Sequence, residues 1–164
     1  MIRAVIFDAD GTLWKGESFI MRPPFEKISD NAIKDPRGRE VVLFEGIREL
    51  LDFLNEKKVF IGLAAQNFFD TVFEILDLFG IQHYFTEEIV IVDWATKVMM
   101  FDKILASDFL LKNGLEPENI AFVDDNESEN LIPVKRKYPG IKTILANENL
   151  SHIQEIIELV SADF

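Results

Sequence analysis

The sequence contains no cysteine and only two histidines, His83 and His152. The absence of cysteine excludes disulfide bonds, thiolate catalysis and cysteine-based zinc sites, and two histidines are too few for a multi-histidine metal centre. No apolar run approaches the roughly 18 residues that are needed to span a bilayer. No signal peptide precedes the first apolar stretch, so we expect a cytoplasmic protein that is not bound to a membrane.

Basic residues are also scarce, since 17 Lys and Arg stand against 29 Asp and Glu and give a formal net charge of -12. This charge disfavours nucleic acid and anionic membranes as partners, but it permits a phosphorylated substrate if a metal ion lies in the site. The 164 residues, 48% of them hydrophobic, are enough for one domain with a substantial core. The sequence does not indicate an oligomeric state.

Short apolar runs typical of buried strands alternate with segments of helical periodicity. Strands are expected at 4–7, 59–65, 88–92, 120–123 and 141–145, and helices at 45–57, 71–79, 98–111, 131–137 and 151–160. This alternation predicts an α/β fold, in which residues 1–164 form a single doubly wound, Rossmann-like domain. Its parallel sheet would have about five strands, with the strand at 4–7 in the centre.

One segment, 19–44, interrupts this alternation. It contains Pro23-Pro24, and Asp35-Pro36-Arg37-Gly38 lies between two β-prone runs. Asp-Pro-x-Gly in that context is typical of a turn. We therefore expect a β-hairpin flap over about residues 19–44, inserted after the first strand and beside its carboxyl end.

Two carboxylates, Asp8 and Asp10, follow the first strand directly, and Gly11 and Thr12 come next. Ligands of open α/β sheets bind outside the carboxyl ends of the strands, which is where these acids lie. Two acids that face one crevice repel each other, so they need a cation, a proton or a basic partner. A single Asp after a strand is commonly only a turn residue, whereas this doublet favours a functional site.

A second acidic pair, Asp124-Asp125, ends the apolar run 120–123. Alone, it is equally consistent with the N-cap of a following helix. Together with Asp8 and Asp10, it places four acids at one edge of the sheet. A site with only oxygen ligands suits Mg²⁺.

Lys97 opens the expected helix after the strand at 88–92. Most lysines are simply solvated, but this one lies at a strand-to-helix junction, where it could balance the acids and hold a phosphate oxygen. Ala64-Ala65-Gln66-Asn67 follows the apolar run 59–63 and offers small side chains, two amides and the start of a helix. A helix cap by Asn67 explains the last of these equally well.

These motifs resemble those of a known superfamily. Asp8-Ala9-Asp10-Gly11-Thr12 closely resembles the first motif of the haloacid dehalogenase superfamily, and Lys97 and Asp124-Asp125 fall in the order and spacing of its third and fourth motifs. The chain is similar to the small, capless magnesium-dependent phosphatases over nearly its whole length, through Thr12-Leu13-Trp14, Pro23-Pro24-Phe25-Glu26-Lys27 and Asp35-Pro36-Arg37-Gly38. The resemblance implies Mg²⁺-dependent hydrolysis of a phosphomonoester, either a phosphoprotein or a small phosphorylated metabolite.

The resemblance also implies a role for each acid and for the lysine. Asp8 would be the nucleophile that forms an aspartyl-phosphate, and Asp10 would protonate the leaving oxygen and then activate water. The side chains of Asp8 and Asp125 and the backbone carbonyl of Asp10 would bind Mg²⁺. Lys97 would stabilise the nucleophile and the transferring phosphoryl group, and Asp124 would orient Lys97 or a metal-bound water.

The chain departs from the superfamily at the second motif, which carries a Ser or Thr hydroxyl for a phosphate oxygen. Ala65 occupies this position or, with a slip of one residue, Gln66 does, so we expect the amide of Gln66 or Asn67 to replace the hydroxyl. Thr12, Ala65, Gln66 and Asn67 are therefore the predicted substrate-binding residues. Two alternatives stay open: a phosphotransferase, and a metal- or phosphate-binding regulatory module with weak or no turnover.

Overall fold

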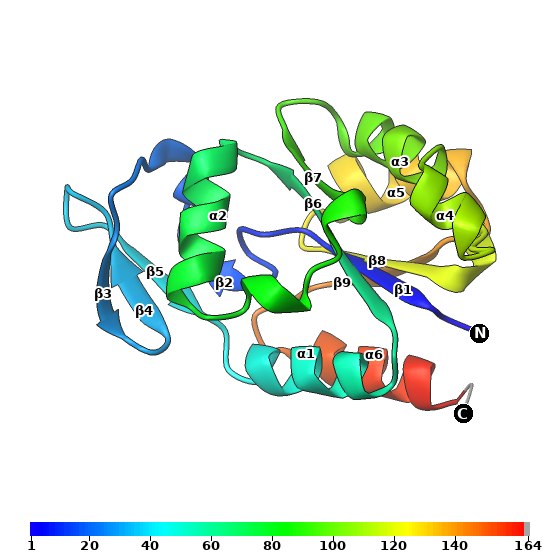
Figure 1. Cartoon of the computed structure of the whole chain (residues 1–164), viewed down its shortest axis with the longest axis horizontal. Coiled ribbons are helices and arrows are strands. Elements are labelled where there is room, and N and C mark those ends of the chain that lie inside the picture. The colour runs from blue at the N-terminus through cyan, green and yellow to red at the C-terminus, as the bar shows by residue number, and fades with distance from the viewer. Residues whose placement is uncertain (163–164) are drawn as a thin grey trace.

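The computed structural model, which describes residues 1–162, contains the predicted parallel sheet at its centre (Figure 1). The sheet has five strands in the order β7-β6-β1-β8-β9. The strands are β1 (Ala4–Phe7), β6 (Phe60–Gln66), β7 (Val90–Asp93), β8 (Ile120–Asp124) and β9 (Lys142–Leu145). Every neighbouring pair is parallel, and β1 lies in the middle. The predicted α/β fold and the central position of the first strand are confirmed.

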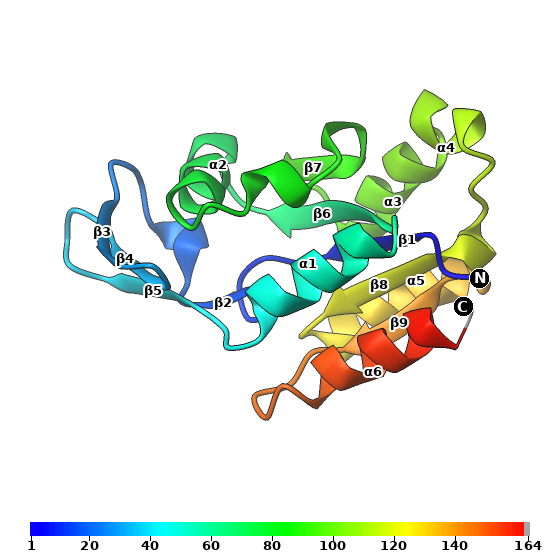
Figure 2. The same cartoon turned by 60° about the horizontal axis from the view of Figure 1, so that its bottom comes forward.

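Helices cover both faces of this sheet (Figure 2). They are α1 (Ile47–Glu56), α2 (Phe69–Leu78), α3 (Lys97–Leu105), α4 (Asp108–Lys112), α5 (Ile132–Lys137) and α6 (Ser151–Ser161). Apolar residues of α1, α2 and α6 belong to one buried cluster, and those of α3, α4 and α5 belong to another. The sheet is therefore enclosed by two separate hydrophobic layers, as expected for a parallel sheet.

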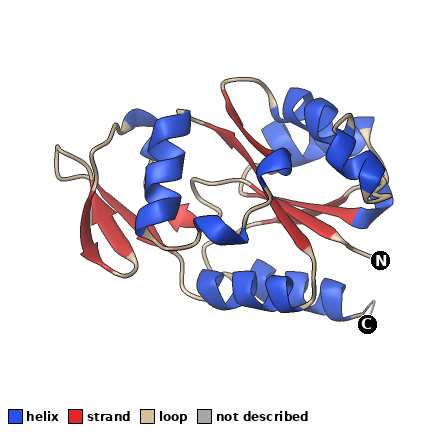
Figure 3. Ribbon diagram, in the orientation of Figure 1, coloured by secondary structure: helices blue, strands red, loops and turns tan. Residues whose placement is uncertain are grey.

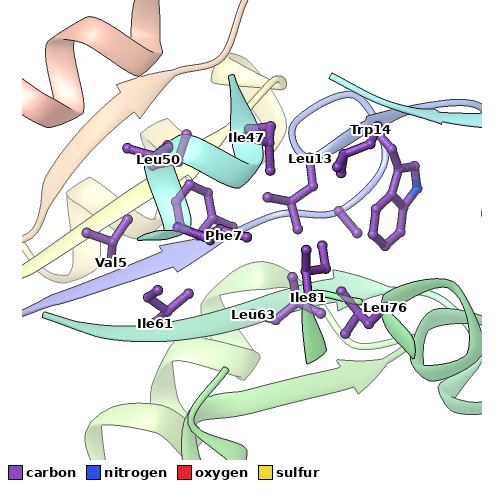
Figure 4. Close-up of a cluster of buried hydrophobic side chains, with 14 of the residues drawn as sticks. Val5, Phe7, Leu13, Trp14, Ile47, Leu50, Ile61, Leu63, Leu76 and Ile81 are labelled. Atoms are coloured by element: carbon purple, nitrogen blue, oxygen red, sulfur yellow. The ribbon is translucent and has the colours of Figure 1, made fainter. Parts of the chain in front are cut away.

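The side chains of β1 alternate between these two layers. Val5 and Phe7 belong to the cluster with α1, whereas Ala4 and Ile6 belong to the cluster with α3. Figure 4 shows Val5 and Phe7 beside Leu50. Because successive residues of a strand point to opposite faces, only an apolar run can fill both layers. The strand is thus held firmly up to its carboxyl end, where the acidic motif begins.

The 19–44 segment contains three strands and not only the two of the predicted hairpin. It contributes to a second, four-stranded antiparallel sheet in the order β2-β5-β4-β3 (Figure 3). The strands are β2 (Trp14–Lys15), β3 (Glu26–Ser29), β4 (Ala32–Lys34) and β5 (Glu40–Leu43). The predicted turn at Asp35–Gly38 joins β4 to β5, but the short β2 and the separate strand β3 were not predicted. Both lack the long apolar run by which strands were recognised.

Three other boundaries differ from the prediction. The helix expected at 98–111 is two helices, because Ser107 caps α4 through a hydrogen bond from the Leu110 amide. Residues Glu87–Ile89 form a 3₁₀ turn, so the third strand begins only at Val90. A π-helical turn over Glu127–Leu131 precedes α5, and Pro133 lies in the first turn of α5.

Among residues 1–162, no helix is both long enough and apolar enough to cross a membrane.

Candidate active site

The first and second acidic motifs meet because their strands are neighbours. β1 pairs with β8 in register up to Phe7 and Val123, and the Asp8 amide donates a 2.9 Å hydrogen bond to the Val123 carbonyl. Carboxylate oxygens of Asp8, Asp124 and Asp125 consequently lie within 4.8 Å of one another. These three acids form the only group in the described part of the chain that could hold a metal ion through Asp, Glu or His ligands.

Lys97 is the cation of this cluster, and it is only 3% exposed. It is the first residue of α3, whose N-cap is Thr96. Its Nζ donates to Asp8 Oδ1 at 2.6 Å and to the Ala64 carbonyl, and it lies 3.4 Å from Asp124 Oδ2. Because a buried ammonium needs compensating partners, this geometry fixes the lysine between the two acidic strand ends.

Asp124 is completely buried and holds the loop that follows β8. Its Oδ1 accepts from the Asn126 amide at 2.9 Å, and both carboxylate oxygens accept from Asn130 Nδ2 at 3.1 Å. The π-helical turn brings Asn130 back to this position. Asn130 was not predicted from the sequence, because its place six residues after the acid fits neither helical nor strand periodicity.

Burial, with a contribution from the neighbouring carboxylates, raises the pKa values of two acids of the cluster. Burial raises the pKa of Asp8 to about 7, with Lys97 opposing the shift and Asp124 and Asp125 adding to it. Burial and the charge of Asp124 also raise the pKa of Asp125. One lysine therefore does not neutralise the cluster, and a bound cation would relieve the repulsion.

Gly11 allows the loop after β1 to approach these acids. Its φ is +79°, and a Cβ at this position would lie 2.2 Å from Asp125 Oδ2. A side chain would therefore both strain the backbone and displace the carboxylate. The glycine of the first motif is explained by this close contact.

Asp10 turns away from the cluster and toward the antiparallel sheet. Trp14 Nε1 donates to Asp10 Oδ1 at 2.6 Å, Ser18 Oγ donates to the same oxygen, and the Phe19 amide donates to Oδ2 at 3.2 Å. Burial raises the pKa of Asp10, although these donated hydrogen bonds oppose the shift. Ser18 was not predicted from the sequence, because no spacing rule connects it to the acidic motif.

The predicted substrate-binding residues have different surroundings. Thr12 is 1% exposed and donates to Asp8 Oδ2 at 3.3 Å, so it lies behind the acid and not on the cavity wall. Ala65 and Gln66 lie at the end of β6, and the exposed Gln66 amide donates to the Ala95 carbonyl at 2.8 Å. Asn67 is buried, and its Nδ2 donates to Ser18 Oγ at 2.8 Å.

A single cavity of about 1190 Å³ joins these residues. Its walls include Asp8, Asp10, Ala65, Gln66, Asn67, Lys97 and Asp125, which come from the ends of β1, β6 and β8 and the start of α3. Of the 19–44 segment, only Phe19 and Phe44 line it. The strands β3 and β4 lie away from the parallel sheet (Figure 1). The expected flap thus reaches the cavity only through its two ends.

An acidic cluster and a buried lysine at the carboxyl edge of a doubly wound sheet define a phosphatase of the haloacid dehalogenase type. Solved structures share this fold over nearly the whole chain. A haloacid dehalogenase superfamily hydrolase from Ehrlichia chaffeensis is 15% identical, with a TM-score of 0.67 and coverage of 99% of this chain and 98% of that one.

The N-terminal part of a Bacteroides fragilis protein, which contains a phosphatase domain complexed with Mg, is also 15% identical, with a TM-score of 0.65. It matches 97% of this chain, which spans only 40% of that structure.

The particular family follows from the sequence match. The acid phosphatase family matches residues 1–153, and the chain belongs to it. Human magnesium-dependent phosphatase 1 is 28% identical over 137 residues, which cover 82% of this chain and 73% of the human protein. The resemblance predicted from the acidic motifs is confirmed.

Proposed function

We propose that this protein hydrolyses phosphomonoesters with the help of Mg²⁺, through an aspartyl-phosphate formed on Asp8. The observation that carries the proposal is the position of the Asp8 carboxylate, which lies on a cavity wall, contacts Lys97 and faces Asp124 and Asp125. The mechanism and the choice of metal rest on the chemistry of these groups and on the relatives that share the fold.

The donor set fits Mg²⁺. Every candidate ligand is a carboxylate or carbonyl oxygen, which suits a hard cation, and burial together with neighbouring carboxylates raises the pKa values of Asp8 and Asp125. Asp8, Asp125 and the backbone carbonyl of Asp10 would hold the ion. When bound, Mg²⁺ would neutralise the acids and stabilise charge on the phosphoryl oxygens. A human relative is named as magnesium-dependent, which agrees with this assignment.

The reaction then has two balanced steps. An oxygen of Asp8 attacks phosphorus while the ester bond breaks, and Asp10 gives its proton to the leaving oxygen. In the second step, Asp10 takes a proton from water as that water attacks phosphorus, and the bond to Asp8 breaks. Lys97 stabilises the nucleophile and the transferring phosphoryl group throughout, because it is fixed against Asp8 and Asp124.

The substrate is a phosphoprotein or a small phosphorylated metabolite. The cavity, about 1190 Å³ in volume, is somewhat larger than the usual small-molecule site of about 300–1,000 Å³. We also propose that residues 1–164 form one cytoplasmic phosphatase domain with the 19–44 segment as an insertion. Ile33 and Val41 of that segment share a buried cluster with Val5 and Phe7, which supports this.

Two alternatives stay open, and the missing hydroxyl at positions 65 and 66 is an argument for one of them, the regulatory module. A phosphotransferase would pass the phosphoryl group to an acceptor other than water, and a regulatory module would bind metal or phosphate with little turnover. An assay for inorganic phosphate separates all three when it is run with and without an added acceptor alcohol. Only the hydrolase releases one phosphate for every ester cleaved in the presence of the acceptor.

The decisive test varies the metal. We expect phosphate release from 4-nitrophenyl phosphate to require a divalent cation, and Asp125→Asn to raise the Mg²⁺ concentration needed for half-maximal activity by about tenfold or more. Glu148→Gln is the matched control, because Glu148 lines the same cavity outside the carboxylate cluster. Full activity in excess chelator would overturn the proposal.

A further inference from the structure

A chain of buried hydrogen bonds joins the end of β6 to Asp10. Asn67 Nδ2 donates to Ser18 Oγ at 2.8 Å, and Ser18 Oγ donates to Asp10 Oδ1. Asn67 is 2% exposed and Ser18 is 0% exposed, so water does not compete for these contacts. Ser18 thus links the Asp10 carboxylate to Asn67, which is distant in sequence.

The direction of each hydrogen bond in this chain is fixed. Asn67 Oδ1 accepts from the Phe68 amide at 2.6 Å, which leaves the amide nitrogen of Asn67 to face Ser18. Because Ser18 Oγ accepts that hydrogen bond, its own single proton is directed to Asp10. Asn67 therefore acts on Asp10 by orienting a hydroxyl and not by direct contact.

We propose that Ser18 and Asn67 are positioning residues for Asp10, and that they set which of its oxygens delivers the proton to the leaving group. Asp10 Oδ1 accepts from both Ser18 and Trp14, so its two lone-pair directions are occupied. Asp10 Oδ2 accepts only from the Phe19 amide, at 3.2 Å. The proton transferred to the substrate accordingly resides on Oδ2. This inference rests on the proposed role of Asp10 as general acid.

This placement changes the expected role of Asn67. The sequence predicts that the amide of either Gln66 or Asn67 binds a phosphate oxygen, and in the structure both polar atoms of the Asn67 amide have protein partners. Asn67 acts on the leaving-group side of the reaction, through Ser18. The exposed amide of Gln66 donates only to the Ala95 carbonyl, so Gln66 is the better candidate in this loop for binding a phosphate oxygen.

The experiment compares two substrates of similar size, phenyl phosphate and 4-nitrophenyl phosphate. Phenolate, whose conjugate acid has a pKa near 10, is the poorer leaving group and depends more on a proton donor. We expect Ser18→Ala to lower kcat/KM for phenyl phosphate about tenfold more than for 4-nitrophenyl phosphate. Asn67→Ala should also lower kcat/KM more for phenyl phosphate than for 4-nitrophenyl phosphate, but by a smaller factor. In the Ser18→Ala background it should not change the ratio of the two kcat/KM values further, because Asn67 acts only through Ser18.

Thr71→Val is the matched control. The Thr71 hydroxyl, which is also buried, donates to the Met21 carbonyl at 3.0 Å and so ties the same segment to α2 without contacting Asp10. Loss of this hydroxyl should change kcat/KM for both substrates by the same factor. Ser18→Thr retains a hydroxyl and should recover the wild-type ratio of the two substrates.

The outcomes separate this inference from the proposed function. Suppose that Asp10→Asn lowers kcat/KM much more for phenyl phosphate than for 4-nitrophenyl phosphate, whereas Ser18→Ala lowers kcat/KM equally for both. The positioning role is then wrong and the mechanism stands. If Asp10→Asn shows no leaving-group bias, Asp10 is not the general acid, and both are overturned. If Asp10→Asn and Ser18→Ala both lower kcat/KM more for phenyl phosphate than for 4-nitrophenyl phosphate, and Thr71→Val does not, the positioning role and the mechanism are both supported.

Discussion

The two sheets of this protein each bury an aspartate at the end of a strand, but the two acids have opposite surroundings. Asp8 follows β1 of the parallel sheet, and Asp35 follows β4 of the antiparallel sheet. Asp35 Oδ1 accepts from the Arg37 and Arg39 amides, and Oδ2 accepts from the Arg39 guanidinium at 2.7 Å. Asp8 has one lysine and one weakly placed hydroxyl, and it faces two further carboxylates.

The pKa values of Asp8 and Asp35 shift in opposite directions because of these different surroundings. Burial alone would raise both, but the hydrogen bonds and charge of Arg39 hold the pKa of Asp35 below its ordinary value. For Asp8, burial prevails over Lys97 and the pKa rises to about 7. A fully partnered acid stabilises the fold, whereas an incompletely partnered acid is kept at a cost in stability and is available to a metal and a substrate.

The largest expected effect comes from the incompletely partnered acid. Asp8→Asn keeps the shape of the side chain but removes the nucleophile, so kcat should fall by about 10⁴-fold or more. No phosphoenzyme should be trapped when the reaction is quenched in acid. A variant that retains wild-type turnover would exclude the mechanism, and circular dichroism would exclude misfolding as the cause of a loss.

The reverse pattern is expected for the fully partnered acid. Asp35→Asn weakens a charge-assisted network in the turn, so the free energy of unfolding should fall by about 1.5–3 kcal/mol. The melting temperature should drop by roughly 5–10 °C, while kcat/KM stays within about twofold below the transition. Asp30→Asn is the control, since the Asp30 side chain is 90% exposed and its ion pair with Lys27 is a surface contact worth little. A large loss of activity in Asp35→Asn at full folding would contradict the comparison.

The acidic cluster and the antiparallel sheet also differ in how far the sequence predicted them. Apolar runs placed all five parallel strands, because buried strands need residues that fill both layers, and the acids at their ends could be located by topology alone. Ser18 and Asn130 were missed because the segments that bring them to their acids have no period that relates sequence distance to spatial distance. A turn and the short strand β2 precede Ser18, and a π-helical turn contains Asn130. The strand β3 was missed because all four of its residues are exposed and leave no hydrophobic pattern.

A smaller effect is expected in the pH dependence of stability without metal. Because the pKa of Asp8 is raised to about 7 in the folded protein, against 3.8 as its ordinary value, the folded form binds more protons between these limits. Its contribution to stability is therefore present at low pH and is lost as the pH rises through about 7. Lowering the pH from 8 to 6 in chelator should stabilise the wild type by roughly 1 kcal/mol relative to Asp8→Asn.

This difference between wild type and variant reports on Asp8 and on its contact with Asp125. Asp35 contributes no slope in this range, because its lowered pKa keeps it ionised in both the folded and the unfolded states. Thermal melts at several pH values, without and with Mg²⁺, provide the measurement. A wild type that becomes less stable than Asp8→Asn as the pH falls from 8 to 6 would contradict the assigned sign.

The smallest effect concerns the missing hydroxyl at the end of β6. Ala65 is 2% exposed and lines the cavity, so Ala65→Ser adds one oxygen at the edge of the site without enlarging a packed side chain much. A well-placed donor to a charged phosphate is worth about 1.5–3 kcal/mol, but a serine without a fixed rotamer should yield less, and we expect kcat/KM to rise about three- to tenfold. The gain should be equal for phenyl and 4-nitrophenyl phosphate, since the contact is to the phosphoryl group and not to the leaving group.

Gln66→Ala tests the other register of the same motif. If the Gln66 amide already serves as the phosphate donor, Ala65→Ser should change nothing and Gln66→Ala should lower kcat/KM by about tenfold for both substrates. The two results exclude each other, because a phosphate oxygen that already has its donor gains nothing from a second one at the neighbouring position. If neither variant changes kcat/KM, this loop does not contact the phosphate. The end of β6 would then act on the reaction only through Asn67 and Ser18, and its effects would appear solely in the leaving-group dependence.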